Sequence, residues 1–153
     1  MRGLAILLGS AATVFALDHL TKWLVLRDIP LGHQVPASGP VTLHHIQNFG
    51  AAFGLFPGFQ AAFLVVAVLV SVYILVVGHR AGTGPLTQVT LGAVLGGAAA
   101  NAVDRFRQGY VVDFVDLHRW PIFNLADTAI VLGIIATVLT LGARPVRDVE
   151  AAR

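Results

Sequence analysis

The chain has 153 residues, of which 56% are hydrophobic and only 12% are charged. An ordinary soluble domain carries about 25% charged residues, so this composition excludes one and indicates an integral membrane protein. The net charge of +2 results from ten lysines and arginines against eight acidic residues, and the basic residues are scattered singly along the chain. No basic stripe is present, so we expect no nucleic-acid partner. The absence of cysteine excludes disulfides, thiolate nucleophiles and thiolate metal sites.

Four segments approach the length of about 20 apolar residues that a membrane-spanning helix needs. Together they predict a single membrane domain, residues 1–153, whose helices cover about residues 3–26, 59–78, 86–103 and 123–141. The third segment is the least apolar but is rich in small residues. Its Gly92, Gly96 and Ala100 recur every four residues, a spacing that lets helix backbones approach closely in lipid. We therefore expect this stripe to serve helix packing.

The two long connections, 27–58 and 106–122, lie on the same side of the predicted membrane. Within the first, residues 41–49 alternate partly between apolar and polar and are bounded by Pro40 and Gly50, which predicts a short strand or hairpin. The second is expected to be a polar loop. The predicted fold class is an all-α membrane protein with four transmembrane helices and a small extracytoplasmic loop region that contains β-structure.

The orientation is nearly balanced, because five of the ten lysines and arginines fall on each side of the predicted membrane. Lys22 and Arg105 each lie beside an aspartate near a helix end, so we assign them to a site and not to a topogenic loop. The remaining charges then favour cytoplasmic termini. A cleavable signal peptide over the first twenty residues is an alternative, but the apolar helix continues into Asp18 and Lys22 with no polar domain after it.

The acidic residues concentrate on the outer side of this predicted bundle. A carboxylate at membrane depth is costly unless it is paired, hydrated or neutralised, so a functional role is its default interpretation. Asp127 lies one turn inside an apolar segment with no basic residue within helical reach, which makes it the strongest candidate. Six of the eight acids share that side: Asp18, Asp28, Asp104, Asp113, Asp116 and Asp127.

Helical spacing groups the polar residues further. Asn101 shares a helix face with Asp104 and Arg105, and Asn124 shares one with Asp127. Asp104 and Arg105 are most simply a charge pair that anchors a helix end. Asp18 and Lys22, four residues apart, are likewise expected to form a stabilising pair.

Two neighbouring carboxylates that share one proton form a known catalytic device. The ionised member takes a proton from water, which attacks a carbonyl, and the protonated member hydrogen-bonds the developing oxyanion and assists the leaving amine. Asp113 and Asp127 are the candidate pair. This aspartic peptide hydrolysis needs no cofactor and no metal.

Five runs of sequence, in order along nearly the whole chain, resemble the signature of the lipoprotein signal peptidase family, also called signal peptidase II. The length and the four predicted spans also suit that family. The runs are Asp18-His-Leu-Thr21-Lys22, Asn48-Phe-Gly50-Ala-Ala-Phe53-Gly54, Asn101-Ala-Val-Asp104-Arg105, Gly109-Tyr-Val-Val-Asp113-Phe114 and Phe123-Asn124-Leu-Ala-Asp127.

The resemblance implies roles for these residues. Asp113 and Asp127 would be the catalytic dyad of an aspartic endopeptidase. The residues implied to bind substrate or to support the dyad and the fold around it are Asn48, Gly50, Asn101, Arg105, Asn124, Asp18, Lys22 and Asp104.

The resemblance also implies the reaction and its partners. The family cuts diacylglyceryl-modified bacterial prolipoproteins just before the lipidated cysteine, and globomycin-type cyclic peptides inhibit it. The enzyme would lie among membrane lipids in the bacterial cell (inner) membrane, with its active site near the outer leaflet. Its long outer loop would form a β-structured cradle and a mobile flap.

Two positions depart from the family pattern. Ala100 stands where the family usually has glycine before Asn101, and Thr128 stands where a serine often follows the last aspartate. The first change bears on helix packing, and the second keeps the hydroxyl. Neither affects the proposed dyad.

Four alternatives remain open. A small transporter or channel could use Asp127 to relay protons or ions. A serine–lysine peptidase would need Lys22 with Ser38, because Ser10 lies about 18 Å away along the same helix. A metal-dependent phosphotransferase could hold Mg²⁺ on the clustered acids. Finally, the adjacent His44 and His45 could suggest a metal, although neighbours on a strand point to opposite faces.

Overall fold

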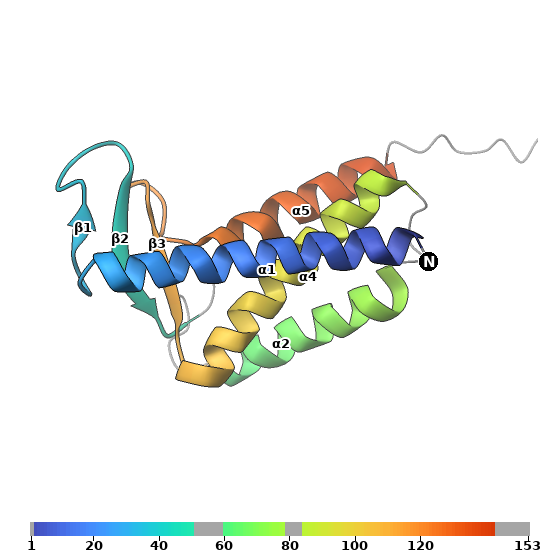
Figure 1. The fold of residues 1–153 in the computed structure, drawn as a ribbon, viewed down its shortest axis with the longest axis horizontal. Coiled ribbons are helices and arrows are strands. Elements are labelled where there is room, and N and C mark those ends of the chain that lie inside the picture. Colours follow the sequence, from blue (N-terminus) through green and yellow to red (C-terminus); the bar gives the residue numbers. More distant parts are fainter. Residues whose placement is uncertain (1, 51–59, 79–83, 143–153) are drawn as a thin grey trace, which may run out of the picture.

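The computed structural model describes residues 2–50, 60–78 and 84–142. The remaining part of the expected outer loop, including any flap within residues 51–58, lies outside the described residues. Figure 1 shows α1 running along the molecule, with a small sheet at one end and the N-terminus at the other. The helices are α1 (Arg2–Asp28), α2 (Gln60–Tyr73), α4 (Pro85–Gln108) and α5 (Leu125–Gly142), with a π-helical segment, η2 (Ile74–Gly78), directly after α2.

Within the described residues, three helices are long and apolar enough to cross a membrane: α1, α4, and α2 together with η2 over Ala61–Gly78. The fourth, α5, is apolar but shorter. Large apolar side chains such as Leu69 on α2 and Leu132 on α5 are exposed. Long stripes of exposed apolar side chains are unusual in water-soluble proteins, so these helix faces indicate a lipid environment.

The central helix is α4, which packs against α1, α2 and α5. Small residues of α4 allow its backbone to approach α1 and α5 closely. A Cβ atom added at Gly96 would lie 2.4 Å from the Ala11 carbonyl oxygen of α1, and one at Gly97 would lie 2.5 Å from the Ala126 carbonyl oxygen of α5. Ala100 is fully buried. The prediction that this stripe serves close helix packing is therefore confirmed.

The sheet has three antiparallel strands in the order β1 (Gln34–Val35), β2 (Thr42–Asn48) and β3 (Val111–Asp116). The strand predicted over 41–49 is confirmed as β2, which has an irregularity between Leu43 and Ile46. The third strand lies in the stretch expected to be a polar loop. Its residues are buried on both faces, with only Val115 half-buried, so no alternation marked it in the sequence.

Three helix ends differ from the predicted bounds by two residues or more. The helix α1 runs to Asp28, two residues beyond 26. The helix α4 runs five residues beyond 103, because Arg105 and Arg107 form its last turn and Gly109 ends it in the left-handed region at φ 78°. Basic residues at a helix carboxyl end are favourable, and glycine is the usual residue there. The helix α5 begins two residues later than predicted, because Phe123 pairs with Val115 beside β3.

Candidate functional site

The site is built around the amino end of α5. Asn124 precedes the helix, and its side-chain oxygen accepts a hydrogen bond from the Asp127 backbone N–H at 2.9 Å. The Asp127 carboxylate accepts one in return from the Asn124 backbone N–H at 3.3 Å. This reciprocal arrangement is a capping box, which satisfies donors that a helix start leaves free. A third donor, the Ala126 N–H, binds the Asp18 carboxylate at 2.8 Å.

Asp113 lies on β3 and is only 1% exposed, so the expectation of an ordinary loop position is replaced by a buried strand position. Its two carboxylate oxygens accept hydrogen bonds from Asn48 Nδ2 at 2.8 Å and from Asn124 Nδ2 at 2.6 Å. Burial, and next the negative charge of Asp127, raise the pKa of Asp113 to about 7. Asn124 contacts both candidate carboxylates, because its backbone N–H binds Asp127 and its side-chain amide binds Asp113.

Asn101 on α4 supports the pair from the other side. Its amide nitrogen donates to Asp127 Oδ1 at 2.8 Å. Its amide oxygen accepts from Lys22 Nζ at 2.9 Å and from Asn124 Nδ2 at 3.3 Å. One buried amide thus connects α1, α4 and α5 at the candidate dyad.

Lys22 lies between two carboxylates. Its ammonium is 2.6 Å from Asp18 Oδ2, which confirms the pair expected from their spacing. It is also 2.6 Å from Asp104 Oδ2. Asp104 is thus paired with Lys22 across the helix interface, and the charge pair expected between Asp104 and Arg105 is not among the described ion pairs.

Arg105 reaches the polypeptide backbone instead. Its guanidinium donates to the carbonyl oxygens of Asn101 and Gly50, each at 3.2 Å. The Gly50 N–H in turn donates to Asn48 Oδ1 at 2.8 Å. Within the described part of the chain, the buried Nε of Arg105 has no hydrogen-bond partner. Arg105 therefore links α4 to Gly50, which follows β2. Gly50 in turn contacts Asn48, the residue that binds Asp113.

Two of the six outer acids lie outside this cluster. Asp28 forms an exposed pair with Arg27 at 2.7 Å. Asp116, at the end of β3, accepts the backbone N–H of His118 at 2.7 Å and lies 3.3 Å from His44 Nδ1. The His118 hydrogen bond, more than the nearby imidazoles, lowers the pKa of Asp116. These contacts make both acids local structural groups.

The described residues give little support to the two metal-binding alternatives. Among the residues that the structure describes, no group of three or more histidines and acids is arranged to hold a metal ion. His45 is buried, and its Nδ1 lies 2.8 Å from the Ile29 carbonyl oxygen. Its neighbour His44 instead contacts Asp116.

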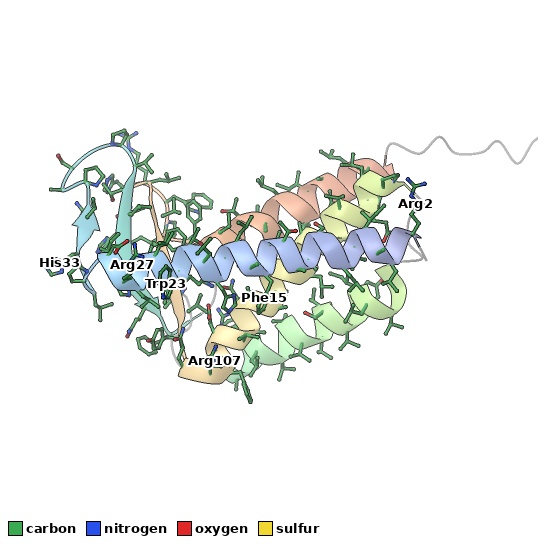
Figure 2. All side chains as sticks on the ribbon, viewed as in Figure 1. Arg2, Phe15, Trp23, Arg27, His33 and Arg107 are labelled. Carbon is green, nitrogen blue, oxygen red and sulfur yellow. The ribbon has the colours of Figure 1, made fainter. Side chains whose placement is uncertain are left out.

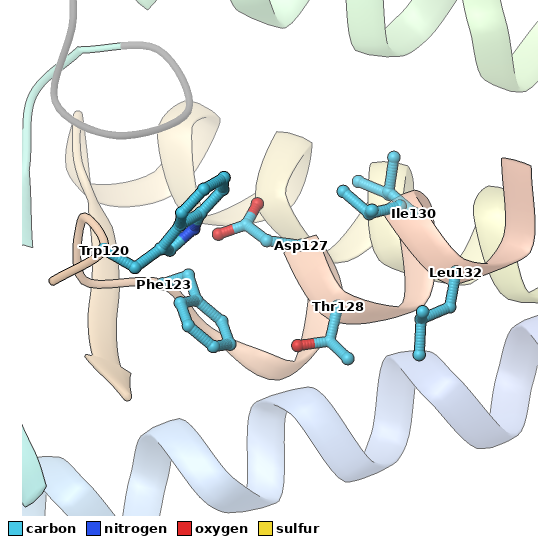
Figure 3. Close-up of a pocket in the computed structure, with 7 residues that line it drawn as sticks. Trp120, Phe123, Asp127, Thr128, Ile130 and Leu132 are labelled. Carbon is cyan, nitrogen blue, oxygen red and sulfur yellow. The ribbon is translucent and has the colours of Figure 1, made fainter. Parts of the chain in front are cut away.

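An apolar pocket opens beside Asp127, a feature that the sequence did not indicate. Figure 3 shows the Asp127 carboxylate facing the Trp120 ring, with Phe123 and Thr128 beside it. The pocket continues along α5 as far as Leu132, which is 60% exposed. Trp120 was identifiable only as an aromatic residue near a membrane end, because its position next to the dyad depends on the turn between β3 and α5.

The fold and the site define a membrane-embedded protein with a pair of carboxylates, one buried and one half-buried, at one end of a helix bundle. A family model described as signal peptidase (SPase) II matches residues 10–142. The chain belongs to the signal peptidase II family.

Individual relatives agree with this assignment. The lipoprotein signal peptidase of Syntrophomonas wolfei is 40% identical over 135 residues, which cover 87% of this chain and 91% of the relative. That of Mycobacterium avium is 42% identical over 145 residues, covering 90% and 79%. A solved bacterial membrane enzyme aligns with a TM-score of 0.78 at 25% identity, covering 95% of this chain and 94% of that structure.

Proposed function

We propose that this chain is a membrane-embedded aspartic endopeptidase that removes signal peptides from diacylglyceryl-modified bacterial prolipoproteins, cutting just before the lipidated cysteine. Membership of the signal peptidase II family assigns removal of signal peptides from prolipoproteins. The observation that carries the aspartic mechanism is the joining of Asp113 and Asp127 through Asn124. Two carboxylates held close to each other, with Asp113 buried, favour sharing of one proton.

In this mechanism the carboxylates of Asp113 and Asp127 act on a water molecule and on the scissile carbonyl. The ionised carboxylate takes a proton from the water, the water oxygen attacks the carbonyl carbon, and the protonated carboxylate hydrogen-bonds the oxyanion and then supplies a proton to the leaving amine. Asn48, Asn101 and Asn124 hold the carboxylates by the contacts described above. No metal or cofactor takes part in this scheme.

Arg105 has a separate role in the proposal. Its guanidinium holds the Gly50 carbonyl, and its buried Nε is a free donor within the described chain. Substrate backbone carbonyls are acceptors that such a donor binds. We therefore assign Arg105 and Gly50 to substrate binding.

The apolar pocket beside Asp127 suits a substrate that arrives through lipid. Its wall combines Trp120 and Phe123 with residues of α5 that are exposed on the lipid-facing side of the helix. In this proposal the diacylglyceryl chains stay among the membrane lipids, while the scissile bond reaches the carboxylates at the pocket's end. Globomycin-type cyclic peptides, as apolar peptide analogues, would occupy the same site.

The proposed topology has four spans, cytoplasmic termini and an active site near the outer leaflet of the bacterial cell (inner) membrane. Figure 2 shows Trp23, Arg27 and Arg107 at the sheet end and Arg2 at the opposite end. Trp23 is exposed, as expected for an interfacial tryptophan. Lys22 is buried between two carboxylates, which supports leaving it out of the topogenic charge count.

The transporter alternative is not favoured, because the family and its relatives are peptidases. A cleavage assay distinguishes a peptidase from a transporter. Purified protein in detergent is given a prolipoprotein with and without the diacylglyceryl group, with a chelator present. We expect the lipidated precursor to be cut and the unlipidated one to be cut poorly. Efficient cleavage of the unlipidated precursor would refute the lipid dependence, and no cleavage of either would refute the proposed function.

A further inference from the structure

The buried ammonium of Lys22 is held by three neighbours. Its Nζ donates to Asp104 Oδ2 at 2.6 Å and to Asn101 Oδ1 at 2.9 Å, and it forms an ion pair with Asp18 Oδ2 at 2.6 Å. The residue is only 3% exposed. Two carboxylates would suffice to neutralise one lysine, so the contact with the neutral amide of Asn101 needs a separate explanation.

The contact fixes which way the Asn101 amide points. An ammonium can only donate, so the amide oxygen must face Lys22 and the amide nitrogen must face away. That nitrogen donates to Asp127 Oδ1 at 2.8 Å. With the amide reversed, its oxygen would oppose the Asp127 oxygen and the hydrogen bond would be lost. Lys22 thereby determines a donor to Asp127 without touching it.

The two carboxylates of the dyad have unequal surroundings. Asp127 lies in the first turn of α5, where the partial positive charge of a helix start favours an anion. The positive charges of Lys22 and Arg105 act on both carboxylates. Asp113 lies on a strand, and within the described residues it accepts hydrogen bonds from the neutral amides of Asn48 and Asn124. Burial, together with the charge of Asp127, raises the pKa of Asp113 to about 7.

We infer that Lys22 is a positioning residue that, through Asn101, holds Asp127 as the ionised carboxylate and leaves the resting proton on Asp113. This inference rests on the proposed function, and it adds the proton assignment and its cause. Asp127 is then the group that takes a proton from the attacking water. Asp113 is the group that hydrogen-bonds the oxyanion and protonates the leaving amine.

Charged groups on every neighbouring element bear on this assignment. Asp18 and Asp104 contact Lys22 from α1 and α4, and His19 lies 3.8 Å from Asp104. Arg105 from α4 acts on both carboxylates of the dyad, and Asp113 from β3 and Asp127 act on each other. Asp104 offsets the positive charge of Lys22 without contacting Asp127. Removing the charge of Asp104 therefore makes the surroundings of Asp127 more positive, whereas removing the charge of Lys22 makes them more negative.

The test compares the pH dependence of kcat for cleavage of a diacylglyceryl-modified prolipoprotein by the parent, Asp104→Asn and Lys22→Met. In Asp104→Asn, the asparagine keeps an acceptor for Lys22 and removes a negative charge. The acidic limb of the pH profile, where kcat falls as Asp127 becomes protonated, should therefore move to lower pH by about one unit. In Lys22→Met the limb should move to higher pH, with kcat reduced about 100-fold and KM little changed. Asp28→Asn, an exposed aspartate of α1, is the matched control and should leave the limb in place.

The outcomes separate the two proposals. Cleavage by the parent with opposite movements of the limb supports the role of Lys22. Cleavage by the parent with equal loss at every pH, and no movement in Asp104→Asn, would show that the lysine only holds the fold and would overturn the inference alone. If Lys22→Met does not fold, Asp104→Asn still decides. A parent that cuts nothing would instead overturn the proposed function.

Discussion

Asn124 and Asp127 hold each other at the start of α5 through two backbone-to-side-chain hydrogen bonds, one in each direction. The Asn124 side chain is used twice, because its oxygen caps the helix and its nitrogen binds Asp113 Oδ1 at 2.6 Å. A single residue therefore sets both the helix start and the position of the second carboxylate.

The first prediction separates these two uses. In Asn124→Ser the hydroxyl can still cap the helix, but the donor to Asp113 is lost. We expect kcat to fall about 100-fold, since an oriented polar group in an active site contributes on the order of 10²–10³. Its unfolding temperature should fall, because buried oxygens of Asp113 and Asn101 lose their amide donor. Asn124→Ala should lose the same activity and a further ~1 kcal/mol of stability with the helix cap.

The measurement for Asn124 is a rate assay together with thermal unfolding in detergent. Near-parental kcat in Asn124→Ser would contradict the account, because it would show that Asp113 does not need the amide.

The second prediction concerns the contact between α4 and α5 that places Asn101 against Asp127. A Cβ at Gly97 would lie 2.5 Å from the Ala126 carbonyl oxygen and 3.0 Å from Ile130. Gly97→Ala should therefore push the helices apart, costing about 1–3 kcal/mol and most of the activity. Gly9→Ala is the control, because nothing lies within 4 Å of a Cβ there. Equal stability of the two variants would show that the helices do not pack this closely.

The third prediction follows from the pKa of Asp113, which the fold raises from 3.8 to about 7. Between these values the unfolded chain binds fewer protons than the native one, so stability falls as the pH rises from about 4 to 7. The full effect is at most about 4 kcal/mol. Asp113→Asn removes this titration. Its unfolding temperature relative to the parent should therefore be higher at pH 8 than at pH 5, and a difference independent of pH would contradict the buried protonated state.

The fourth prediction addresses the apolar pocket. Trp120 lines it together with Asp127, so Trp120→Ala should raise KM for the lipidated precursor about tenfold and change kcat less. Trp23→Ala is the control, because Trp23 lies on α1, stacks on Arg27 and does not line this pocket. Similar kinetics for the two variants would remove Trp120 from substrate binding.

Much of the site was accessible from the sequence because helical spacing fixes which residues share a face. This spacing groups Asn101 and Asp127 with their neighbours, and the Asp18–Lys22 pair follows directly from a separation of four residues. The long apolar segments were likewise visible from composition, since a lipid environment requires them. The resemblance to signal peptidase II then joined these separate groups.

The remaining features depend on contacts between distant parts of the chain. The partner of Asp104 is Lys22, 82 residues away, and no local rule selects it over the adjacent Arg105. The burial of Asp113 comes from β3, whose residues are covered on both faces and so show no alternation. Similarly, Trp120 reaches Asp127 only because Phe123 pairs with Val115.

The most direct test of the central claim is cleavage of a diacylglyceryl-modified prolipoprotein by the purified parent, Asp113→Asn and Asp127→Asn, with a chelator present. We expect cleavage by the parent and its loss in both variants, with each variant still folded by thermal unfolding. Clear cleavage by either folded variant, or loss of the parent's activity to the chelator, would contradict a metal-free dyad of Asp113 and Asp127.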